Sequence, residues 1–417
     1  MSSTQSRIAI LSTIISSNTD RIDKHLNKNS LPHPSFSADA PLDLNLPPEL
    51  EKARIEVLHA TQELNDLLQG PRDLLFNHQH GKVIYLDLLT RFNIPSLVPA
   101  DGTTTFTQLA EATGIPEGPL TRIMRLAIAH RVFAEPEKGR VAHSAASRVL
   151  VDDERVRAWW KGNMQEMWPS AGRVVDALVK WPSGEGVDES GFQLANNTSK
   201  SFYQVLGEDP ARAKRFALAM DFFAQDPGYA MTHVVNSFEW SALPNDASIV
   251  DLGGSTGDLA FTLSATYPEF KIIVQELPEV VAQATARPGV NVTFEAHDFF
   301  TEQPVHGAAV YIFRWVLHNW PDKHCIQVLR ALIPALVKGA KVLVMDFVMP
   351  EPGLLPNEIE RKLRAMDLTM LQIANARERE MGEWENLFAR ADVRFKFVGP
   401  RYSEGSKLTM LEVVWDG

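Results

Sequence analysis

The chain has 417 residues, which is too long for one ordinary core and predicts two or three domains. Its hydrophobic content of 45% and charged content of 22% are typical of a globular protein and argue against a disordered or fibrous chain. A net charge of -11, without any long run of lysine and arginine, argues against nucleic acid as a partner.

The sequence contains a single cysteine, Cys325, so the chain can form neither an internal disulfide nor a cysteine-based metal site. The longest apolar run near the start, residues 8–15, is far shorter than the roughly 20 residues that a membrane-spanning helix needs. This region also lacks the cleavage site that follows the basic start of a signal peptide. We therefore expect a cytoplasmic protein with no membrane contact and no bound metal.

The first 100 residues are predicted to be a helical dimerisation region. Residues 1–30 carry apolar side chains at helical spacing, a proline-rich linker covers residues 32–48, and further helices are expected over residues 49–68 and 71–92. Helices this apolar favour burial against a second copy of the chain, in an interwoven homodimer. Packing on their own domain is the alternative.

Residues 101–150 resemble a winged helix. Residues 108–116 match the first helix and turn of a helix-turn-helix, residues 119–130 form the second helix, and residues 132–135 and 138–143 resemble a two-stranded wing. The acidic balance of the chain argues against a DNA-reading role. We therefore interpret this part as scaffolding.

Residues 151–240 are predicted to be a mainly helical connector that contributes to a substrate pocket. From residue 241 to the end, short apolar strands alternate with helical segments. The strands are expected over residues 249–252, 271–275, 292–296, 309–313, 341–345, 393–398 and 408–415. This alternation predicts an α/β fold with a parallel, doubly wound sheet that binds its ligand at the carboxyl ends of the strands.

A glycine-rich loop follows the first of these strands. In the segment Val-Asp-Leu-Gly-Gly-Ser-Thr-Gly-Asp of residues 250–258, Gly253, Gly254 and Gly257 allow a sharp turn and a close approach of the backbone to a ligand. The spacing differs from Gly-x-Gly-x-x-Gly, and no Gly-Lys-Ser/Thr follows. A phosphate-cradling P-loop is therefore not expected.

Acidic residues also follow the next two strands. Glu276 lies about 20 residues beyond the glycines, where a carboxylate can accept hydrogen bonds from both hydroxyls of a ribose. Asp298 can accept from the amino group of an adenine, with Phe299 against the ring. Each acid alone is more often just a polar strand end, but the ordered set of three elements points to a cofactor that carries ribose and adenine.

The chain resembles the plant and fungal small-molecule O-methyltransferases of the caffeate and flavonoid type over nearly its whole length. Their glycine loop reads Val-Asp-x-Gly-Gly-Gly-x-Gly, in which Ser255 replaces the third glycine, and their Asp-Leu-Pro corresponds to Glu276-Leu-Pro. The segment Phe-Arg-Trp-Val-Leu-His-Asn-Trp-Pro-Asp of residues 313–322 is similar to the family's Lys-x-x-x-His-Asp-Trp. The resemblance implies a class I methyltransferase domain over residues 241–417, with S-adenosylmethionine as the cofactor and Arg314 near its carboxylate end.

The same resemblance places His318 at the family's general-base position. A phenol or enol hydroxyl has a pKa well above neutrality, and an imidazole with an ordinary pKa of about 6.5 can remove its proton as the oxygen attacks. Asp346 and Glu378 fall where the family has the acids that orient the imidazole. Glu378 is matched less well, because its surroundings also fit a solvated charge run.

Four further positions are carried over from the family as substrate-facing: Met220, Phe223, Thr369 and Met370. Methionine is also a common core filler, so that role stays open for Met220 and Met370. Phe223 stands where plant members often have a histidine. This indicates a less polar pocket, which suits a bulky polyketide-derived aromatic or pyridone.

Three functions are compatible with these motifs. The leading interpretation is methylation of a small-molecule hydroxyl in secondary metabolism. Some fungal proteins of this fold are pericyclases, which keep S-adenosylmethionine bound and use its charge to promote dehydration, Alder-ene or hetero-Diels–Alder steps. A non-catalytic regulator that uses the winged-helix part is the third interpretation.

Overall fold

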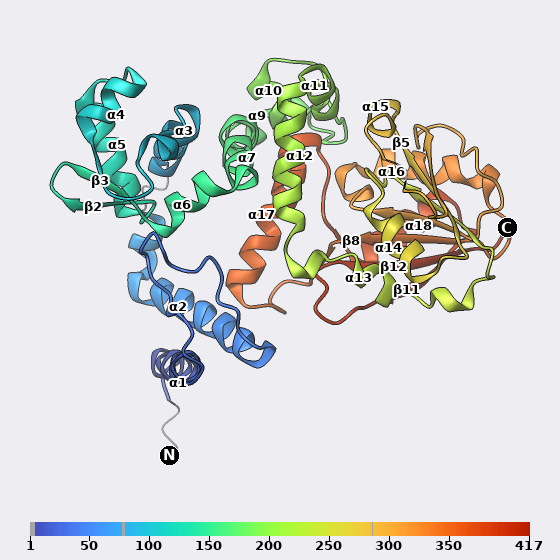
Figure 1. The fold of residues 1–417 in the computed structure, drawn as a ribbon. Coiled ribbons are helices and arrows are strands. Elements are labelled where there is room, and N and C mark those ends of the chain that lie inside the picture. Colours follow the sequence, from blue (N-terminus) through green and yellow to red (C-terminus); the bar gives the residue numbers. More distant parts are fainter. Residues whose placement is uncertain (1–4, 77–79, 286) are drawn as a thin grey trace. The chain divides into compact units, whose positions relative to one another are not determined.

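The computed structural model describes residues 5–76, 80–285 and 287–417. The chain forms two compact units, which we call the N-terminal unit (Met1–Trp168, Pro210–Phe222 and Leu355–Lys362) and the sheet unit (Pro169–Asp209, Phe223–Leu354 and Leu363–Gly417). Figure 1 shows the elements of both units. The finer division at residues 100, 150 and 240 stays a prediction. Within the described ranges, no helix is long and apolar enough to cross a bilayer.

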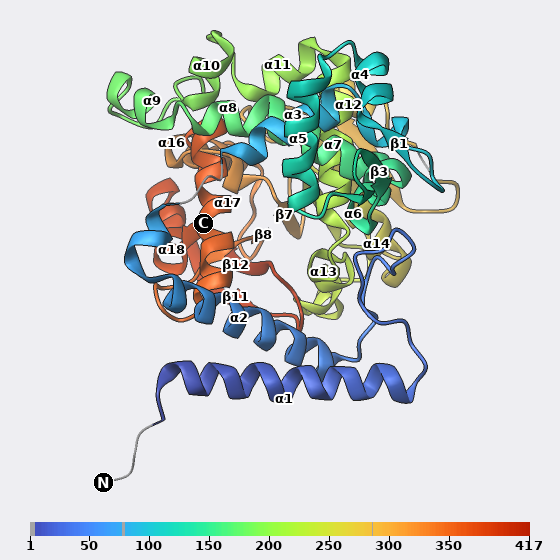
Figure 2. The same cartoon turned by 90° about the vertical axis from the view of Figure 1, so that its left-hand side faces the viewer.

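The N-terminal unit begins with two long helices, α1 (Arg7–Lys28) and α2 (Pro48–Leu75), which pack against one another (Figure 2). They confirm the first two predicted helices and the linker between them, although residues 1–4 of the first prediction lie outside the described residues. The backbone of α2 is non-helical at Gly70, where φ is 70° and ψ is 173°, so the predicted break between a helix ending near residue 68 and one starting at residue 71 is confirmed.

The predicted continuous helix over residues 71–92 is wrong. Helix α2 ends at Leu75, Phe76 leaves helical backbone geometry (φ -95°, ψ 78°), and α3 (Gly81–Arg91) begins only afterwards. Residues 77–79 of the prediction lie outside the described residues. Both segments have helical apolar spacing, and periodicity alone does not reveal a break between two helices that share it.

The helices and strands expected within residues 101–150 are confirmed. Helix α4 (Phe106–Thr113) starts at a capping box between Thr105 and Gln108. The remaining elements are α5 (Glu117–Ala129), β2 (Phe133–Glu137) and β3 (Arg140–His143), and β3 also pairs with the short β1 (Thr104–Thr105). They share an apolar core with α3. The scaffolding role of this part stays a prediction.

Residues 151–240 are mainly helical, as predicted. Their helices, with the one that leads into them, are α6 (Ala145–Asp152), α7 (Glu154–Gly162), α8 (Trp168–Ala171), α9 (Val174–Lys180), α10 (Gly191–Asn196), α11 (Phe202–Glu208), α12 (Pro210–Ala224) and α13 (Thr232–Asn236). Helix α12 and the later α17 (Asn357–Ala374) each contribute residues to both units.

A seven-stranded sheet with the order β11-β12-β8-β7-β4-β5-β6 forms the framework of the sheet unit. Its strands are β4 (Ser248–Leu252), β5 (Lys271–Glu276), β6 (Val292–Ala296), β7 (Val310–Arg314), β8 (Lys341–Asp346), β11 (Phe395–Arg401) and β12 (Thr409–Trp415). Each overlaps a predicted strand.

The prediction of a parallel sheet holds for β4, β5, β6, β7 and β8 but is wrong for β12, which runs antiparallel to both of its neighbours. The connection between β11 and β12 covers only residues 402–408. A link this short can join antiparallel neighbours, whereas a parallel pair needs a crossover of a dozen residues or more.

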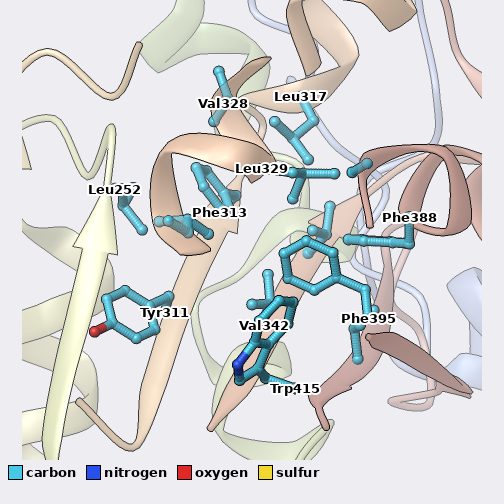
Figure 3. Packing of buried hydrophobic residues seen from close by; sticks show 14 of the residues in the cluster. Leu252, Tyr311, Phe313, Leu317, Val328, Leu329, Val342, Phe388, Phe395 and Trp415 are labelled. Atoms are coloured by element: carbon cyan, nitrogen blue, oxygen red, sulfur yellow. The ribbon is translucent and has the colours of Figure 1, made fainter. Parts of the chain in front are cut away.

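Helices cover both faces of the sheet, because alternate side chains of each strand point to opposite sides. On one face the strands pack against α16 (Asp322–Leu332) and α18 (Met381–Ala391), through Tyr311, Phe313, Val342, Val328, Leu329 and Phe388 (Figure 3). On the other face they pack against α14 (Asp258–Thr266). The helix α15 (Pro278–Val281) follows β5. Strands buried on both faces are apolar throughout, so polar groups at their carboxyl ends are candidates for a ligand site.

Candidate active site

The glycine loop lies between β4 and α14, at the carboxyl end of a central strand. Gly253 and Gly257 have φ values of 71° and 89°, which only glycine adopts readily. A Cβ on Gly254 would lie 2.3 Å from Oδ2 of Asp251, so a side chain does not fit there. Ser255, which replaces the family's third glycine, has a left-handed φ of 51°. The loop therefore makes a tight turn at the strand end that tolerates no side chain at Gly254.

Glu276, at the end of the neighbouring β5, contacts this loop directly. Its two carboxylate oxygens accept from the backbone N–H groups of Ser255 and Leu277, each at 3.0 Å. Burial raises the pKa of Glu276, although these two hydrogen bonds oppose the rise. The structure thus brings the predicted glycines and the first predicted acid together.

Asp298 and Phe299 follow β6, the next strand of the sheet. One carboxylate oxygen of Asp298 accepts from the backbone N–H of Phe300 at 3.0 Å, which stabilises the turn after the strand. Asp298 is exposed, so it remains accessible from solvent. The ring of Phe299 lies 5.1 Å from that of Phe300 and 6.1 Å from that of Trp320.

Arg314 and Asp251 supply opposite charges beside the loop. Arg314 ends β7 and donates from Nη2 to the carbonyl of Tyr229 at 2.6 Å. Neither its Nε nor Oδ2 of Asp251 has a hydrogen-bond partner among the described residues, although both atoms are buried. Burial lowers the pKa of Arg314 to about 10 and raises that of Asp251 to about 7, although the charge of Arg314 lowers the latter.

Sequence reasoning did not single out Asp251 as a site residue. The signal was present, because Asp251 is an acidic side chain among the apolar residues of β4, and the structure shows that it is 1% exposed. A buried carboxylate without a partner, near the carboxyl end of a central strand, indicates a ligand site more strongly than the presence of an acidic residue alone.

His318 lies on the short turn η5 (Leu317–Asn319), just past β7. Its Nδ1 is 2.8 Å from Oε1 of Glu378, and its backbone N–H donates to Oδ2 of Asp346 at 3.3 Å. All three residues are buried, and the second oxygen of each acid has no partner within the described part of the chain. The structure therefore brings together three predicted residues that are far apart in sequence.

The two acids control the charge of the imidazole. Burial disfavours the protonated ring, but the negative charges of Glu378 and Asp346 outweigh this effect, so the pKa of His318 is raised above its ordinary value. Burial likewise raises the pKa of Asp346 to about 6, against the lowering effect of His318. The two carboxylates therefore favour the protonated ring, which makes the imidazole a stronger base than a free histidine.

The alternative that Glu378 lies in a solvated charge run is wrong, because its side chain is 1% exposed. The backbone places it there. The short strand β10 (Arg379–Glu380) pairs with β9 (Val348–Met349), which follows β8, and the N–H of Glu378 donates to Asp367 at 2.9 Å. Glu378 is thus held beside the strand end that carries Asp346.

Of the residues expected to face the substrate, Phe223 has the clearest surroundings. It stacks on Tyr229 at 5.0 Å and lies 5.8 Å from Trp315. The rings continue from Tyr229 to Phe347, and Phe347 lies 6.4 Å from the His318 imidazole. An aromatic cluster therefore leads from Phe223 to the histidine.

Thr369 and Met370 lie on the part of α17 that belongs to the sheet unit, and both are half-buried. The Thr369 hydroxyl donates to the carbonyl of Ala365 in its own helix. Met220 belongs to the N-terminal unit. The substrate contacts of these three residues stay predictions.

Comparison with known proteins identifies the family. Residues 184–394 match the family model of the O-methyltransferase domain. The grayanic acid biosynthesis cluster O-methyltransferase of Cladonia grayi is 40% identical to this chain and covers 98% of it, with 88% of its own length matched. The chlorophenol O-methyltransferase of Trichoderma longibrachiatum is 36% identical and covers 99% of this chain, with 91% of its own length matched.

One solved structure, described as a pericyclic reaction enzyme, matches 97% of this chain and 100% of its own, with a TM-score of 0.72 and 21% identity. At that identity the likeness shows the fold alone. The region matched by the family model contains the glycine loop, Glu276, His318 and Glu378. The sequence-based predictions of family, fold class and cofactor are confirmed, and the chain belongs to the S-adenosylmethionine-dependent O-methyltransferase family.

Proposed function

We propose that this enzyme methylates a phenolic or enolic hydroxyl of an aromatic secondary metabolite, with Nε2 of His318 as the general base. The observation that carries the proposal is the 2.8 Å contact between Nδ1 of His318 and Oε1 of Glu378. A carboxylate only accepts hydrogen bonds, so the ring proton resides on Nδ1 and Nε2 is the basic nitrogen of the neutral imidazole. Nε2 then removes the proton of the substrate hydroxyl as its oxygen attacks.

The residues at the carboxyl ends of β4 to β7 fit S-adenosylmethionine. Glu276 would accept from the ribose hydroxyls, and Asp298 from the adenine amine, with the ring of Phe299 alongside. The unpaired Nε of Arg314 and the unpaired Oδ2 of Asp251 suit a carboxylate and an ammonium group on one ligand. When bound, the cofactor supplies an electrophilic methyl group on a positively charged sulfur.

Asp346 and Glu378 position His318 for this step. Asp346 accepts from the backbone N–H of His318, which fixes the turn, and Glu378 accepts from the ring, which fixes the imidazole plane. Their combined charge also stabilises the imidazolium that forms when the proton is taken up. Each acid thus has a separate geometric role and a shared electrostatic one.

The aromatic cluster indicates the substrate class. Phe223 and the rings packed beside it form an apolar aromatic cluster that leads to His318, and Thr369 and Met370 of the same unit are proposed to face the substrate. The chlorophenol and grayanic acid cluster relatives bear names that fit the same chemistry. We therefore place the reacting hydroxyl on an aromatic ring of low polarity.

The pericyclase alternative requires the same cofactor residues and is supported by a likeness of fold only. Methyl transfer and pericyclase activity are distinguished by incubating the protein with S-adenosylmethionine and a panel of phenols that includes a chlorophenol. Methyl transfer makes a product about one methylene heavier and one S-adenosylhomocysteine per product. Recovery of intact cofactor with a product of unchanged mass, or one lighter by water, would contradict methyl transfer.

We further propose that the enzyme is a homodimer that acts in the cytoplasm. Helix α2 exposes large apolar side chains, with Leu58 48% and Leu68 66% exposed, and such surfaces on a folded protein mark contacts with another chain. The single cysteine suits a reducing compartment.

A further inference from the structure

A buried guanidinium lies beneath the turn that carries His318. Arg379 is 0% exposed, although arginine is among the residues least often buried. Its Nη1 donates to the carbonyl of Leu317 at 3.2 Å, and its Nη2 donates to the carbonyl of Trp320 at 2.8 Å. One planar group therefore binds the chain just before His318 and just after it.

The same guanidinium is anchored on its other side. Its Nε donates to Oδ1 of Asp322 at 3.0 Å, and its carbon lies 5.1 Å from the ring centroid of Trp384. The thiol of Cys325 donates to the same two carbonyls, of Leu317 and Trp320, at 3.2 and 3.3 Å. Asp322 begins α16, so the turn, the start of this helix and Arg379 form one connected group.

Arg379 directly follows Glu378 in the chain, so the contacts of Arg379 with the turn also tie the turn to Glu378. On the other side of Glu378, Arg377 donates to Oδ2 of Asp322 at 2.9 Å. The two arginines that bracket Glu378 therefore bind one carboxylate, and that carboxylate lies four residues after His318. The positions of the imidazole and of its carboxylate partner are tied through a single buried network.

We propose that Arg379 is a positioning residue, whose guanidinium holds the Leu317–Asn319 turn at a fixed distance from Glu378 and thereby sets the alignment of the His318 ring. The inference rests on the proposed role of His318 as the base. Only arginine can perform this task, because its planar fork spans two carbonyls and a carboxylate at once, whereas lysine offers a single point of charge.

The decisive variant is Arg379→Lys, which keeps the positive charge and removes the fork. We expect kcat to fall by about 10-fold, because small displacements of a catalytic group are costly, while the KM for S-adenosylmethionine stays within about twofold. Arg390→Lys is the matched control. Arg390 pairs with the same Asp322 at 2.8 Å but is 46% exposed, and its side chain is bonded to neither carbonyl of the turn. The activity of the Arg390→Lys variant should equal that of the wild type.

The pH dependence of kcat/KM distinguishes a positioning role of Arg379 from a purely electrostatic one. The charged groups that face His318 are Glu378, Asp346 and Arg379, of which the two acids raise its pKa and the arginine lowers it. Loss of alignment weakens the Glu378 contact, so the pKa of His318 falls and the acid limb of kcat/KM moves to lower pH in Arg379→Lys. If Arg379 acted through charge alone, Arg379→Lys would leave the limb in place and Arg379→Met would move it to higher pH. An acid limb that stays in place in Arg379→Lys overturns the proposal, because this variant keeps the charge.

Two further measurements test the proposal if Arg379→Lys does not fold or if no methyl transfer is found. If Arg379→Lys does not fold, as judged by its melting transition and by calorimetric binding of S-adenosylmethionine, Asp322→Asn is measured in its place. That change releases the anchored side of Arg379, and an acid limb identical to wild type then overturns the proposal. The pKa of the His318 ring is also titrated by NMR without substrate, with His318→Ala to assign the signal. A lowered ring pKa in Arg379→Lys supports positioning even if no methyl transfer is found, so this inference and the proposed function can fail separately.

Discussion

The two units differ in their buried polar groups, because every described side-chain atom that is buried without a hydrogen-bond partner lies in the sheet unit. In the sheet unit, buried polar atoms of Asp251, Arg314, Asp346 and Glu378 lack hydrogen-bond partners among the residues described. In the N-terminal unit, α2 instead exposes large apolar side chains, Leu58 and Leu68 among them. An unpaired buried polar group costs about 1–3 kcal/mol, and an exposed apolar patch forgoes burial of a similar scale.

This difference indicates which kind of partner each unit binds. Unpaired charges and dipoles at strand ends are satisfied by a polar ligand of matching pattern, here the cofactor and a substrate hydroxyl. Unburied apolar surface is satisfied by another protein surface. The four predictions that follow test the polar side first, where the expected effects are largest, and the apolar side last.

The largest effect is expected from His318→Ala. Loss of the base should lower turnover by roughly 100-fold or more, because the hydroxyl proton is then left to water. Cofactor binding, measured by calorimetry, should stay close to wild type, since the ring is assigned to the substrate. His306→Ala removes an exposed histidine and serves as the control. Unimpaired turnover in His318→Ala would remove the general-base assignment.

A smaller loss, of about 10-fold near neutral pH, is expected from Glu378→Gln, which keeps the size of the side chain and removes its charge. Glu378 helps to raise the pKa of His318, so the pKa should fall in the variant and the acid limb of kcat/KM should move to lower pH. Glu385→Gln, on the exposed side of α18, is the matched control. A limb that stays in place while turnover falls would show that Glu378 acts without influencing the imidazole.

Asp298→Ala tests the cofactor edge of the sheet. Loss of a charged hydrogen bond to the adenine should weaken S-adenosylmethionine binding by about 10-fold in calorimetry. Because Asp298 also accepts from the N–H of Phe300, Asp298→Asn is compared with it: the amide oxygen can still accept from that N–H. Affinity unchanged in both variants would mean that the adenine lies elsewhere.

The smallest change, a factor of two in mass, concerns the apolar side. Light scattering at micromolar concentration should give the mass of a dimer, and Leu68→Glu, which places a charge on the exposed face of α2, should shift it toward the monomer. Glu63→Gln alters a half-exposed acid on the same helix and should leave the mass unchanged. A monomer mass for the wild-type chain would contradict the interwoven dimer.

Local patterns in the sequence predicted much of this molecule. Glycines at positions 253, 254 and 257 report a tight turn because their backbone conformations and close contacts tolerate no side chain. The alternation of apolar strands and helices predicted all seven strands of the sheet. Both signals are local, since they depend on residues within one turn or one strand.

Apolar periodicity did not reveal the remaining features. The direction of β12 follows from its short connection to β11, and the break after Leu75 interrupts a helical pattern that continues on either side. In the charged run Arg377-Glu378-Arg379, the sequence shows three ionisable residues of similar character. Only the packing of α16, α18 and β9 around them buries Glu378 against His318 and Arg379 beneath its turn.

The sequence by itself therefore indicated the family, the cofactor loop and the histidine, because each lies in a short motif that resembles the motif of a known family. The tertiary structure alone decided between a buried and a solvated Glu378, and it alone showed which arginine lies beneath the turn of that histidine. The physical reason is that burial selects among chemically similar side chains: desolvation makes an unpaired charge costly, so the few charged groups kept inside are those with a partner or a ligand to bind.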